Sequence, residues 1–173
     1  MTEAPRLVVA RDCDENAAEA SEELKEEPSQ EPSEETVAAS PPVEPTLTVE
    51  NNPELAALLA ETDYCDDTVE AFAAKYDDRT VEFDASVALV TNHGDYKTRY
   101  DFLISPGDQG PESTRGPAFK FEDVNYIDLN LSGADNRSSV SVGDLVRVVA
   151  RVEEWDPVQG CLFWLDPIST TFR

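Results

Sequence analysis

The sequence predicts a mainly β domain that is preceded by two helices and a disordered acidic tail. Residues 1–48 are rich in Glu, Pro, Ser and Ala and contain no aromatic residue. Two capped, amphipathic stretches follow before residue 80. From Thr80 onward, apolar residues recur at every second position, in segments separated by Gly- and Pro-rich loops. We therefore expect an α+β domain over 49–173, with a five- to six-stranded antiparallel barrel.

The tail, residues 1–48, cannot bury enough apolar surface to offset the entropy lost when a chain is ordered. Its stretch EEPSQEPSEE is a degenerate repeat of a linker type, extended by its prolines and by repulsion between its charges. The tail is therefore interpreted as a spacer, with acidic bait for a basic partner as the alternative. Order is expected to begin near Leu47.

Two helices are expected at the start of the ordered domain, in ENNPELAALLAE (50–61) and DDTVEAFAAKYDD (66–78). Asn51 or Asn52 caps the first helix, and proline follows at its first position. Asp66 or Asp67 caps the second. The expected buried faces are Leu55, Leu58 and Leu59 in the first helix and Val69, Phe72, Ala73 and Tyr76 in the second.

The strands are expected from alternation. In TVEFDASVAL (80–89) and YKTRYDFLIS (96–105), one residue in two is apolar or aromatic. The NHGD stretch between them predicts a two-residue hairpin loop centred on Asn92–His93 or His93–Gly94. The expected inward positions are Val81, Phe83, Ala85, Val87 and Leu89, then Tyr96, Thr98, Tyr100, Phe102 and Ile104. Later strands are expected in AFKFEDVN and YIDLNLSG (one bent strand or two), VSVGDLVRVVARVEEW and CLFWLDPISTTF.

The formal net charge of -24 argues against partners that are polyanions, such as nucleic acid or an anionic membrane. No stretch reaches the roughly 18 apolar residues that a membrane helix needs, so no membrane span is expected in this chain. The N-terminus, MTEAPRLVVARDCDE, is not a signal peptide as written. An alternative is that PRLVVAR is the end of a longer membrane segment that begins upstream.

His93 is the only histidine, and its neighbourhood raises the question of catalysis. Ser86, Ser105 and Asp95 lie near it in sequence, but no nucleophile-elbow motif is present. A zinc site would need further His or Cys residues nearby. The oxygen-bearing residues of EDVNYIDLN lack EF-hand spacing. We therefore expect no catalytic residue, no metal site and no cofactor, and interpret His93 as part of a turn. The residues of this stretch that could have supplied oxygen ligands to a cation are Asp123, Asn125, Asp128 and Asn130.

Several basic residues fall on outward strand positions, and two interpretations follow. The first is cross-strand ion pairs with Glu82 and Asp84. The second is a binding surface in which aromatic side chains supply stacking platforms. The candidate binding surface comprises Tyr96, Lys97, Arg99, Tyr100, Arg147, Arg151 and Trp155.

The three cysteines, Cys13, Cys65 and Cys161, do not define a disulfide framework. Cys65 and Cys161 would form a disulfide if the fold brings them together in an oxidising compartment. The alternative is a pair of reduced, half-buried thiols. Cys13, in the tail, would be left free or would crosslink chains.

The pattern GDLVRVVARVEEW…CLFWLD, after FAAKYDDRTVEFDASV, resembles the oligonucleotide/oligosaccharide-binding (OB) barrel, in which a long first strand pairs with two others. The alternative is an open antiparallel sheet covered by the helices. A closer resemblance is to a family of actinobacterial C-terminal domains, domain of unknown function 4839. It rests on NNPELAALL, FAAKY, TVEFDASV, NHGDYKTRYDFLI, GPAFKFEDVN and LDPISTTFR.

The family resemblance covers roughly residues 50–173 and carries no activity or catalytic residue to this chain. It implies a domain that sits behind an acidic linker and a membrane or secretory segment. We therefore expect a non-enzymatic binding module for a protein or glycan partner, extracellular or at the cell envelope. A cytoplasmic OB-type protein that binds single-stranded nucleic acid is one alternative, and a small hydrolase is another.

Overall fold

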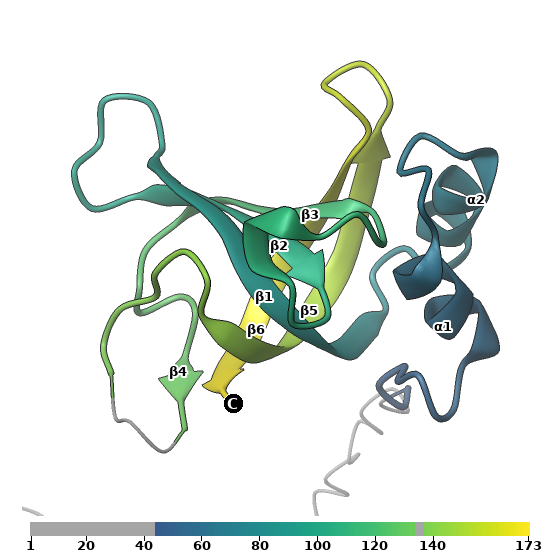
Figure 1. Cartoon of the computed structure of the whole chain (residues 1–173), viewed down its shortest axis with the longest axis horizontal. Helices are drawn as coiled ribbons and strands as arrows, with labels where there is room; N and C mark the ends of the chain where they lie inside the picture. The colour runs from purple at the N-terminus through teal and green to yellow at the C-terminus, as the bar shows by residue number, and fades with distance from the viewer. Residues whose placement is uncertain (1–43, 134–136) are drawn as a thin grey trace, which may run out of the picture. The chain divides into compact units, whose positions relative to one another are not determined.

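The computed structural model describes residues 44–133 and 137–173, and Figure 1 shows two helices beside a set of strongly curved strands. The prediction of a disordered tail falls mostly on residues 1–43, which lie outside the described residues. Leu47, near which order was expected to begin, is buried. Its amide donates to the Thr80 carbonyl and its carbonyl accepts from the Glu82 amide, both at 2.8 Å.

Both helices form where their capping residues predict them. Helix α1 is Pro53–Ala60, and the Asn52 side chain accepts a hydrogen bond from the Leu55 amide at 2.8 Å. Helix α2 is Asp67–Lys75, and the Asp66 carboxylate accepts from the Thr68 amide at 2.8 Å. The predicted apolar faces are buried at Leu55, Leu58, Val69, Phe72 and Ala73, while Leu59 and Tyr76 pack against the core partly exposed.

Five long strands close into a barrel, which confirms the mainly β fold. The strands are β1 (Thr80–Asn92), β2 (Tyr100–Pro106), β3 (Ala118–Val124), β5 (Leu145–Asp156) and β6 (Leu162–Phe172). They lie in the order β3-β2-β1-β5-β6, and a further pairing of β3 with β6 closes the ring. The short strand β4 (Leu131–Ser132) pairs with the far end of β6.

The prediction of an antiparallel barrel is wrong in one respect, because β3 and β6 run parallel. The other four pairs around the ring are antiparallel. A closed ring with an odd number of strands cannot alternate in direction all the way round, so one parallel pair is unavoidable. The short β4 is also parallel to β6.

Aromatic rings form the centre of the barrel and connect it to the helices. The Phe119 ring lies 4.8 Å from that of Phe83 and 5.2 Å from that of Phe163, centroid to centroid. Phe163 also lies 6.2 Å from Phe72 on α2. The barrel interior and the inner face of α2 therefore share one hydrophobic core.

Two predicted directions on β1 are wrong. Leu89 was expected inside but is 43% exposed, because the register with β2 shifts between Val87 and Leu89 and turns the later side chains over. Ser86 lies between the inward positions Ala85 and Val87, so alternation predicts that it faces outward, but it is fully buried. The 3-10 turn η1 (Gly110–Glu112) covers it, and the Gly110 amide donates to its hydroxyl at 2.7 Å.

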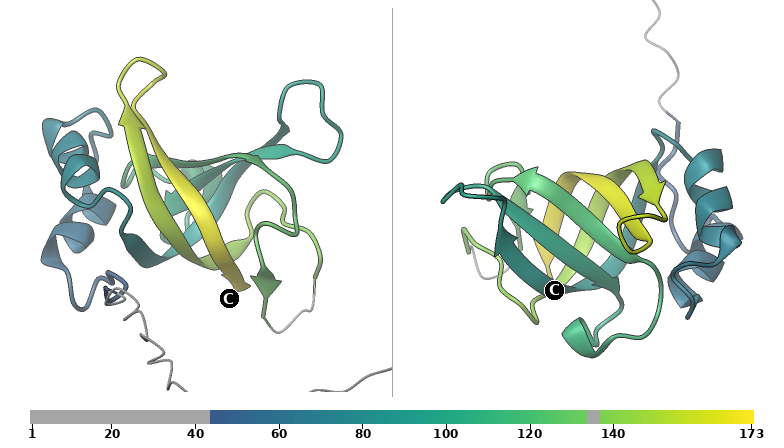
Figure 2. Two further views of the ribbon diagram at one scale, coloured as in Figure 1. Left: turned by 180° about the vertical axis from the view of Figure 1, so that it is seen from behind. Right: turned by 90° about the horizontal axis from the view of Figure 1, so that it is seen from above.

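The helical pair and the loop that joins β1 to β2 lie on opposite sides of the barrel in both views of Figure 2. Among the described residues, none of the helices combines the length and the apolar character that a membrane crossing would take.

Candidate functional site

The loop of residues 93–99 is longer than the predicted two-residue hairpin, and that prediction is wrong. The last pair of the hairpin is Asn92 with Tyr100. The Asn92 side-chain amide donates to the Tyr96 carbonyl at 2.8 Å. The His93 amide donates to the Arg99 carbonyl at 2.9 Å. These bonds replace strand pairing, so Tyr96 and Thr98 do not belong to the inward-facing series.

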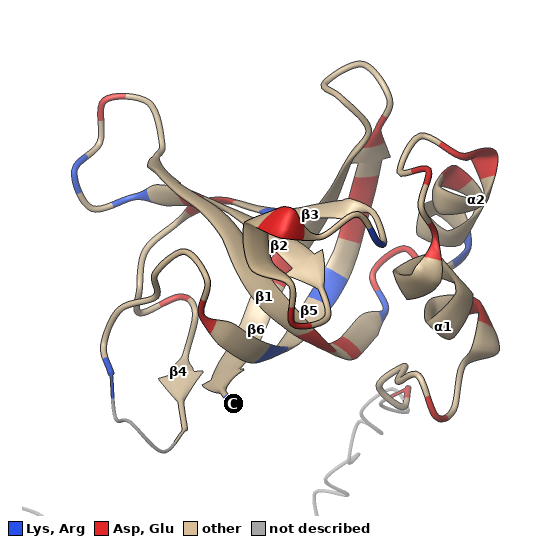
Figure 3. Ribbon diagram, in the orientation of Figure 1, with Lys and Arg blue, Asp and Glu red and all other residues tan. Residues whose placement is uncertain are grey.

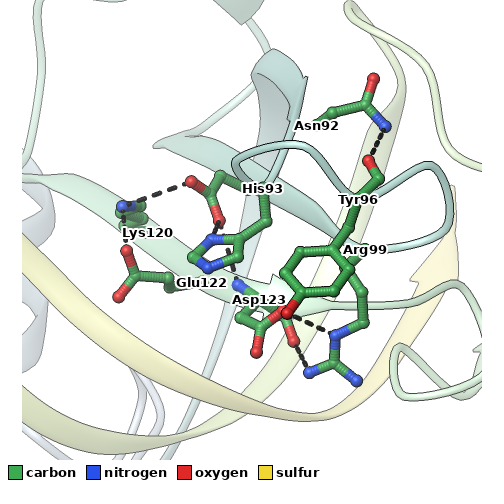
Figure 4. A network of polar contacts seen from close by, with 8 residues as sticks. Asn92, His93, Tyr96, Arg99, Lys120, Glu122 and Asp123 are labelled. Carbon is green, nitrogen blue, oxygen red and sulfur yellow. Dashed lines mark hydrogen bonds and ion pairs between the residues drawn. The ribbon is translucent and has the colours of Figure 1, made fainter.

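A charged cluster is formed by His93 of this loop, Asp101 of β2, and Lys120 and Glu122 of β3. Figure 4 shows His93, Lys120 and Glu122 close together. The His93 Nδ1 atom lies 2.9 Å from the Asp101 carboxylate. The Lys120 ammonium lies 2.7 Å from Glu122 and 3.6 Å from the second oxygen of Asp101. The Asp123 amide also donates to Asp101, at 3.0 Å. Asp101 therefore joins the loop to both strands.

The charged cluster favours the ionised form of Asp101. Burial alone raises the pKa of Asp101 and is the largest single influence on it. The Asp123 amide, His93 and Lys120 together outweigh burial, so the pKa of Asp101 lies below its ordinary value. Lys120 itself is only 12% exposed, and its ammonium stands 4.4 Å above the Trp164 ring on β6.

Arg99 fixes the other end of the loop. Its Nε atom lies 2.6 Å from the Asp123 carboxylate, and its guanidinium also donates to the Asp123 carbonyl. A second carboxylate, Asp128, lies 4.0 Å away. The hydrogen bond between Arg99 and Asp123 raises the pKa of the guanidinium and lowers the pKa of the carboxyl group. The loop is therefore held by charged groups at both of its ends.

Beside the charged cluster is a shallow groove of 390 Å³, lined by residues 98–100 and 125–127, which we call the tyrosine groove. The rings of Tyr100 and Tyr126 lie 4.8 Å apart, and the Tyr100 hydroxyl donates to the Lys97 carbonyl. Burial, with the neighbouring Tyr100, raises the pKa of Tyr126. Ile127 is 87% exposed and Tyr96 is 63% exposed. This end of the barrel thus presents apolar surface to solvent.

The charged cluster includes a set that resembles metal ligands. One ligand atom each of His93, Asp101 and Glu122 lies within 4.8 Å of the other two. However, the Lys120 ammonium already contacts both carboxylates and supplies their countercharge. Two of the candidate cation ligands, Asn125 and Asp128, stabilise a turn instead. The Asn125 side chain accepts from the Ile127 and Asp128 amides, and the Asp128 carboxylate accepts from the Asn125 amide.

The pair of His93 and Asp101 resembles the base and orienting acid of an enzyme with a serine nucleophile. The candidate nucleophiles Ser86 and Ser105 do not lie close to this pair. Ser86 and Ser105 pair with each other on β1 and β2. They lie six and five strand positions from the last hairpin pair, or roughly 20 Å along the strands. Ser86 is also engaged by η1.

Four of the seven predicted surface residues gather at the loop: Tyr96, Lys97, Arg99 and Tyr100. The other three lie elsewhere. Arg147 lies 2.8 Å from Asp84 and 3.9 Å from Glu82, which confirms those predicted ion pairs. Arg151 pairs with Asp166 at 2.5 Å and Asp78 at 3.4 Å, and the partly buried Trp155 packs against the core. Figure 3 shows the basic residues of the loop well away from those of β5.

Sequence reasoning missed the groove and cluster residues that come from β2, β3 and the turn after β3. These are Asp101, Lys120, Glu122, Tyr126 and Ile127. The one local signal is the Asn125-to-Asp128 spacing, which is typical of a side-chain-capped turn. That turn places Ile127 at its tip.

Cys65 and Cys161 form a disulfide in the structure, with their Cα atoms 5.2 Å apart. Cys65 lies between α1 and α2, and Cys161 precedes β6. The bond therefore connects the helical pair to the β5–β6 turn.

Comparison with known proteins gives one family. No curated protein and no solved structure matches the chain. A family model described as a domain of unknown function, DUF4839, matches residues 50–173, which include every helix and strand described above. The chain therefore belongs to the DUF4839 family, and its domain is a β-barrel preceded by two helices.

Proposed function

We propose that the domain is a non-enzymatic binding module and that its ligand, a protein or a glycan, docks at the end of the barrel formed by the 93–99 loop. The observation that carries the proposal is the exposure of Ile127 and Tyr96 beside the tyrosine groove. Exposed apolar groups gathered around a groove, on a surface otherwise rich in charge, are typical of an interaction site.

We further propose that the barrel is of the OB type. Its long first strand pairs with both β2 and β5, and β3 and β6 complete the ring. In OB-type barrels, ligands bind on the face of the second and third strands and on the loops that follow the first and fourth. The loop of residues 93–99 is the first of these loops, and Asp101, Lys120 and Glu122 lie on those two strands.

The compartment we propose is the cell envelope or the extracellular space of an actinobacterium. The support for it is the disulfide between Cys65 and Cys161. Disulfides persist in oxidising compartments and are rare in the cytoplasm, so the bond favours an exported domain.

The two alternative functions have less support. A protein that binds single-stranded nucleic acid needs a basic face, whereas Arg99, Arg147 and Arg151 each pair with carboxylates. A hydrolase of the Ser–His kind needs a nucleophile near His93, and the weighed serines lie at the other end of the hairpin.

Backbone amide spectra of the full chain test the proposal. The protein would be titrated with a panel of soluble cell-wall oligosaccharides and of basic, acidic and neutral peptides. We expect at least one probe to shift the amides of residues 96–100 and 125–128 without being chemically changed. Shifts confined to another surface would contradict the proposed site, and turnover of a probe would contradict the non-enzymatic function.

A further inference from the structure

We infer that the tyrosine groove takes a basic segment of a partner protein, anchored by one apolar side chain. This inference rests on the proposed function of the same groove and chooses between its two ligand classes. Three features of the described residues carry it: the engaged polar groups, the apolar lining and the surrounding charge.

Three of the polar side chains that line the groove, those of Arg99, Tyr100 and Asn125, are already hydrogen-bonded within the protein. The Asn125 side-chain oxygen accepts from two backbone amides, at 2.7 and 3.1 Å. The Arg99 guanidinium donates to both the side chain and the carbonyl of Asp123. A glycan carries many hydroxyl groups, and each loses hydrogen bonds with water when it is buried without a partner. These engaged groups leave the groove with few free partners for the hydroxyl groups of a sugar, which favours a protein ligand.

The apolar part of the groove suits a side chain of a protein. The rings of Tyr100 and Tyr126 contact each other, with centroids 4.8 Å apart and planes tilted by 39°, and so form one continuous aromatic surface. Ile127 lines the groove beside them. The groove is shallow and its 390 Å³ volume is sufficient for one or two side chains. Aromatic residues at such positions commonly supply most of the binding energy of a protein interface.

The charge around the groove selects a basic partner. The carboxylates of the loop, β2, β3 and the turn outnumber the cations there, and the whole chain carries a net charge of -24. Two lysines of the domain itself already stand over aromatic rings, Lys75 at 5.0 Å from Tyr76 and Lys120 at 4.4 Å from Trp164. The exposed Tyr96 ring offers the same kind of contact to an incoming cation. The acidic groups near the groove are Asp95, Asp101, Glu122, Asp123 and Asp128, and the basic ones are Lys97, Arg99 and Lys120.

The test uses the full chain and three short synthetic probes. The first is a peptide in which lysines flank one leucine and one tyrosine. The second replaces its lysines with serine, and the third is a tetrasaccharide of N-acetylglucosamine. We expect the lysine peptide to shift the amides of residues 96–100 and 125–128. We expect the serine peptide to bind at least about fivefold more weakly, because it lacks the attraction to the carboxylates.

Matched variants separate docking in the groove from general attraction to an acidic protein. Ile127→Ser should weaken the lysine peptide about tenfold. Val158→Ser, at a position that is 89% exposed on the β5–β6 turn, should change its affinity less than about twofold. Asp95→Lys should weaken binding more than Asp77→Lys, which makes the same charge change beside α2.

Each other outcome overturns the inference. Binding of the tetrasaccharide at these amides, without the peptide, would make the ligand a glycan and leave the proposed function standing. If Ile127→Ser and Val158→Ser weaken the affinity for the lysine peptide equally, the peptide binds by non-specific attraction and not in the groove. If neither the lysine peptide nor the tetrasaccharide binds, the basic segment is rejected as the ligand. The wider panel of probes described under the proposed function tests that function separately.

Discussion

Phe163 is the residue through which the barrel and the helical pair share a core. Its side chain is fully buried and its ring contacts both Phe119 of β3 and Phe72 of α2. Phe163→Ala should lower the free energy of unfolding by about 3–5 kcal/mol, because the truncation removes apolar contacts and leaves a cavity. Denaturant unfolding measures this loss. Val158→Ala, at an exposed position, should change stability little, and equal effects would contradict the shared core.

Glu153 on β5 is a residue whose charge opposes folding. Partial loss of solvation on the strand raises its pKa, and the neighbouring Asp166 raises it further, although the residue as a whole remains exposed. An acid whose pKa is raised on folding destabilises the native state above its unfolded pKa of about 4.3, and this penalty vanishes below that pH. Glu153→Gln should therefore stabilise the domain at pH 7 by less than about 1 kcal/mol, because solvent screens this exposed group.

Thermal unfolding at several pH values measures the effect of Glu153→Gln. The gain should be present at pH 7 and absent below about pH 4. Glu154→Gln removes the same charge from the next residue and serves as the control. A gain of the same size at both pH values would show that charge at Glu153 is not its source.

At the scale of elements, the Gly116 turn fixes how the segment before β3 meets the end of β2. Gly116 has a φ of +71°, and a Cβ there would lie 2.2 Å from the Cγ atom of Pro106. Its amide also donates to the Glu61 carbonyl. Gly107 has a similar φ of +76°, but a Cβ at that position would have no neighbouring atom within 4 Å. The two glycines thus share a backbone conformation and differ in their surroundings.

Substitution of each glycine by alanine separates conformation from contact. Gly107→Ala should cost about 1 kcal/mol, from the positive φ alone. Gly116→Ala should cost at least about 1–3 kcal/mol more, because Pro106 or the turn must move. Chemical denaturation of both variants measures the difference. Equal costs would contradict the close approach between Gly116 and Pro106.

The disulfide connects two elements across a sequence separation of 96 residues. The double variant Cys65→Ser, Cys161→Ser should lose about 2–5 kcal/mol relative to the oxidised protein, because the crosslink restricts the unfolded chain. Unfolding under non-reducing conditions measures the loss. Cys13→Ser serves as the control and should leave stability unchanged. A double variant as stable as the parent would remove the structural role of the bond.

Elements set by local signals were predictable, and those set by distant contacts were not. Asn52 and Asp66 cap their helices through residues two or three positions away, so the sequence contains the signal. The 93–99 loop is held instead by Asp101 and Asp123, which lie on β2 and β3. The register shift after Val87, which exposes Leu89, arises from the pairing of β1 with β2. The alternation of apolar and polar residues in the sequence does not reveal it.

At the scale of the whole molecule, strand pairing decides which residues become neighbours. The predicted surface divides because Arg147 and Arg151 lie on β5, whereas Lys97 and Arg99 lie in the loop after β1. Periodicity shows which side of a strand a residue faces, but it contains no information on the order of strands around a barrel. The charged cluster and the tyrosine groove depend on that order, so most of their members could be found only in the structure.

The central proposal about where the domain works is that it lies in an oxidising compartment. A count of free thiols by intact mass tests it most directly, on protein recovered from its own host and alkylated without reductant after unfolding. We predict that Cys65 and Cys161 stay protected until the protein is reduced, as an exported disulfide requires. Alkylation of all three cysteines before reduction would contradict export and place the domain in a reducing compartment.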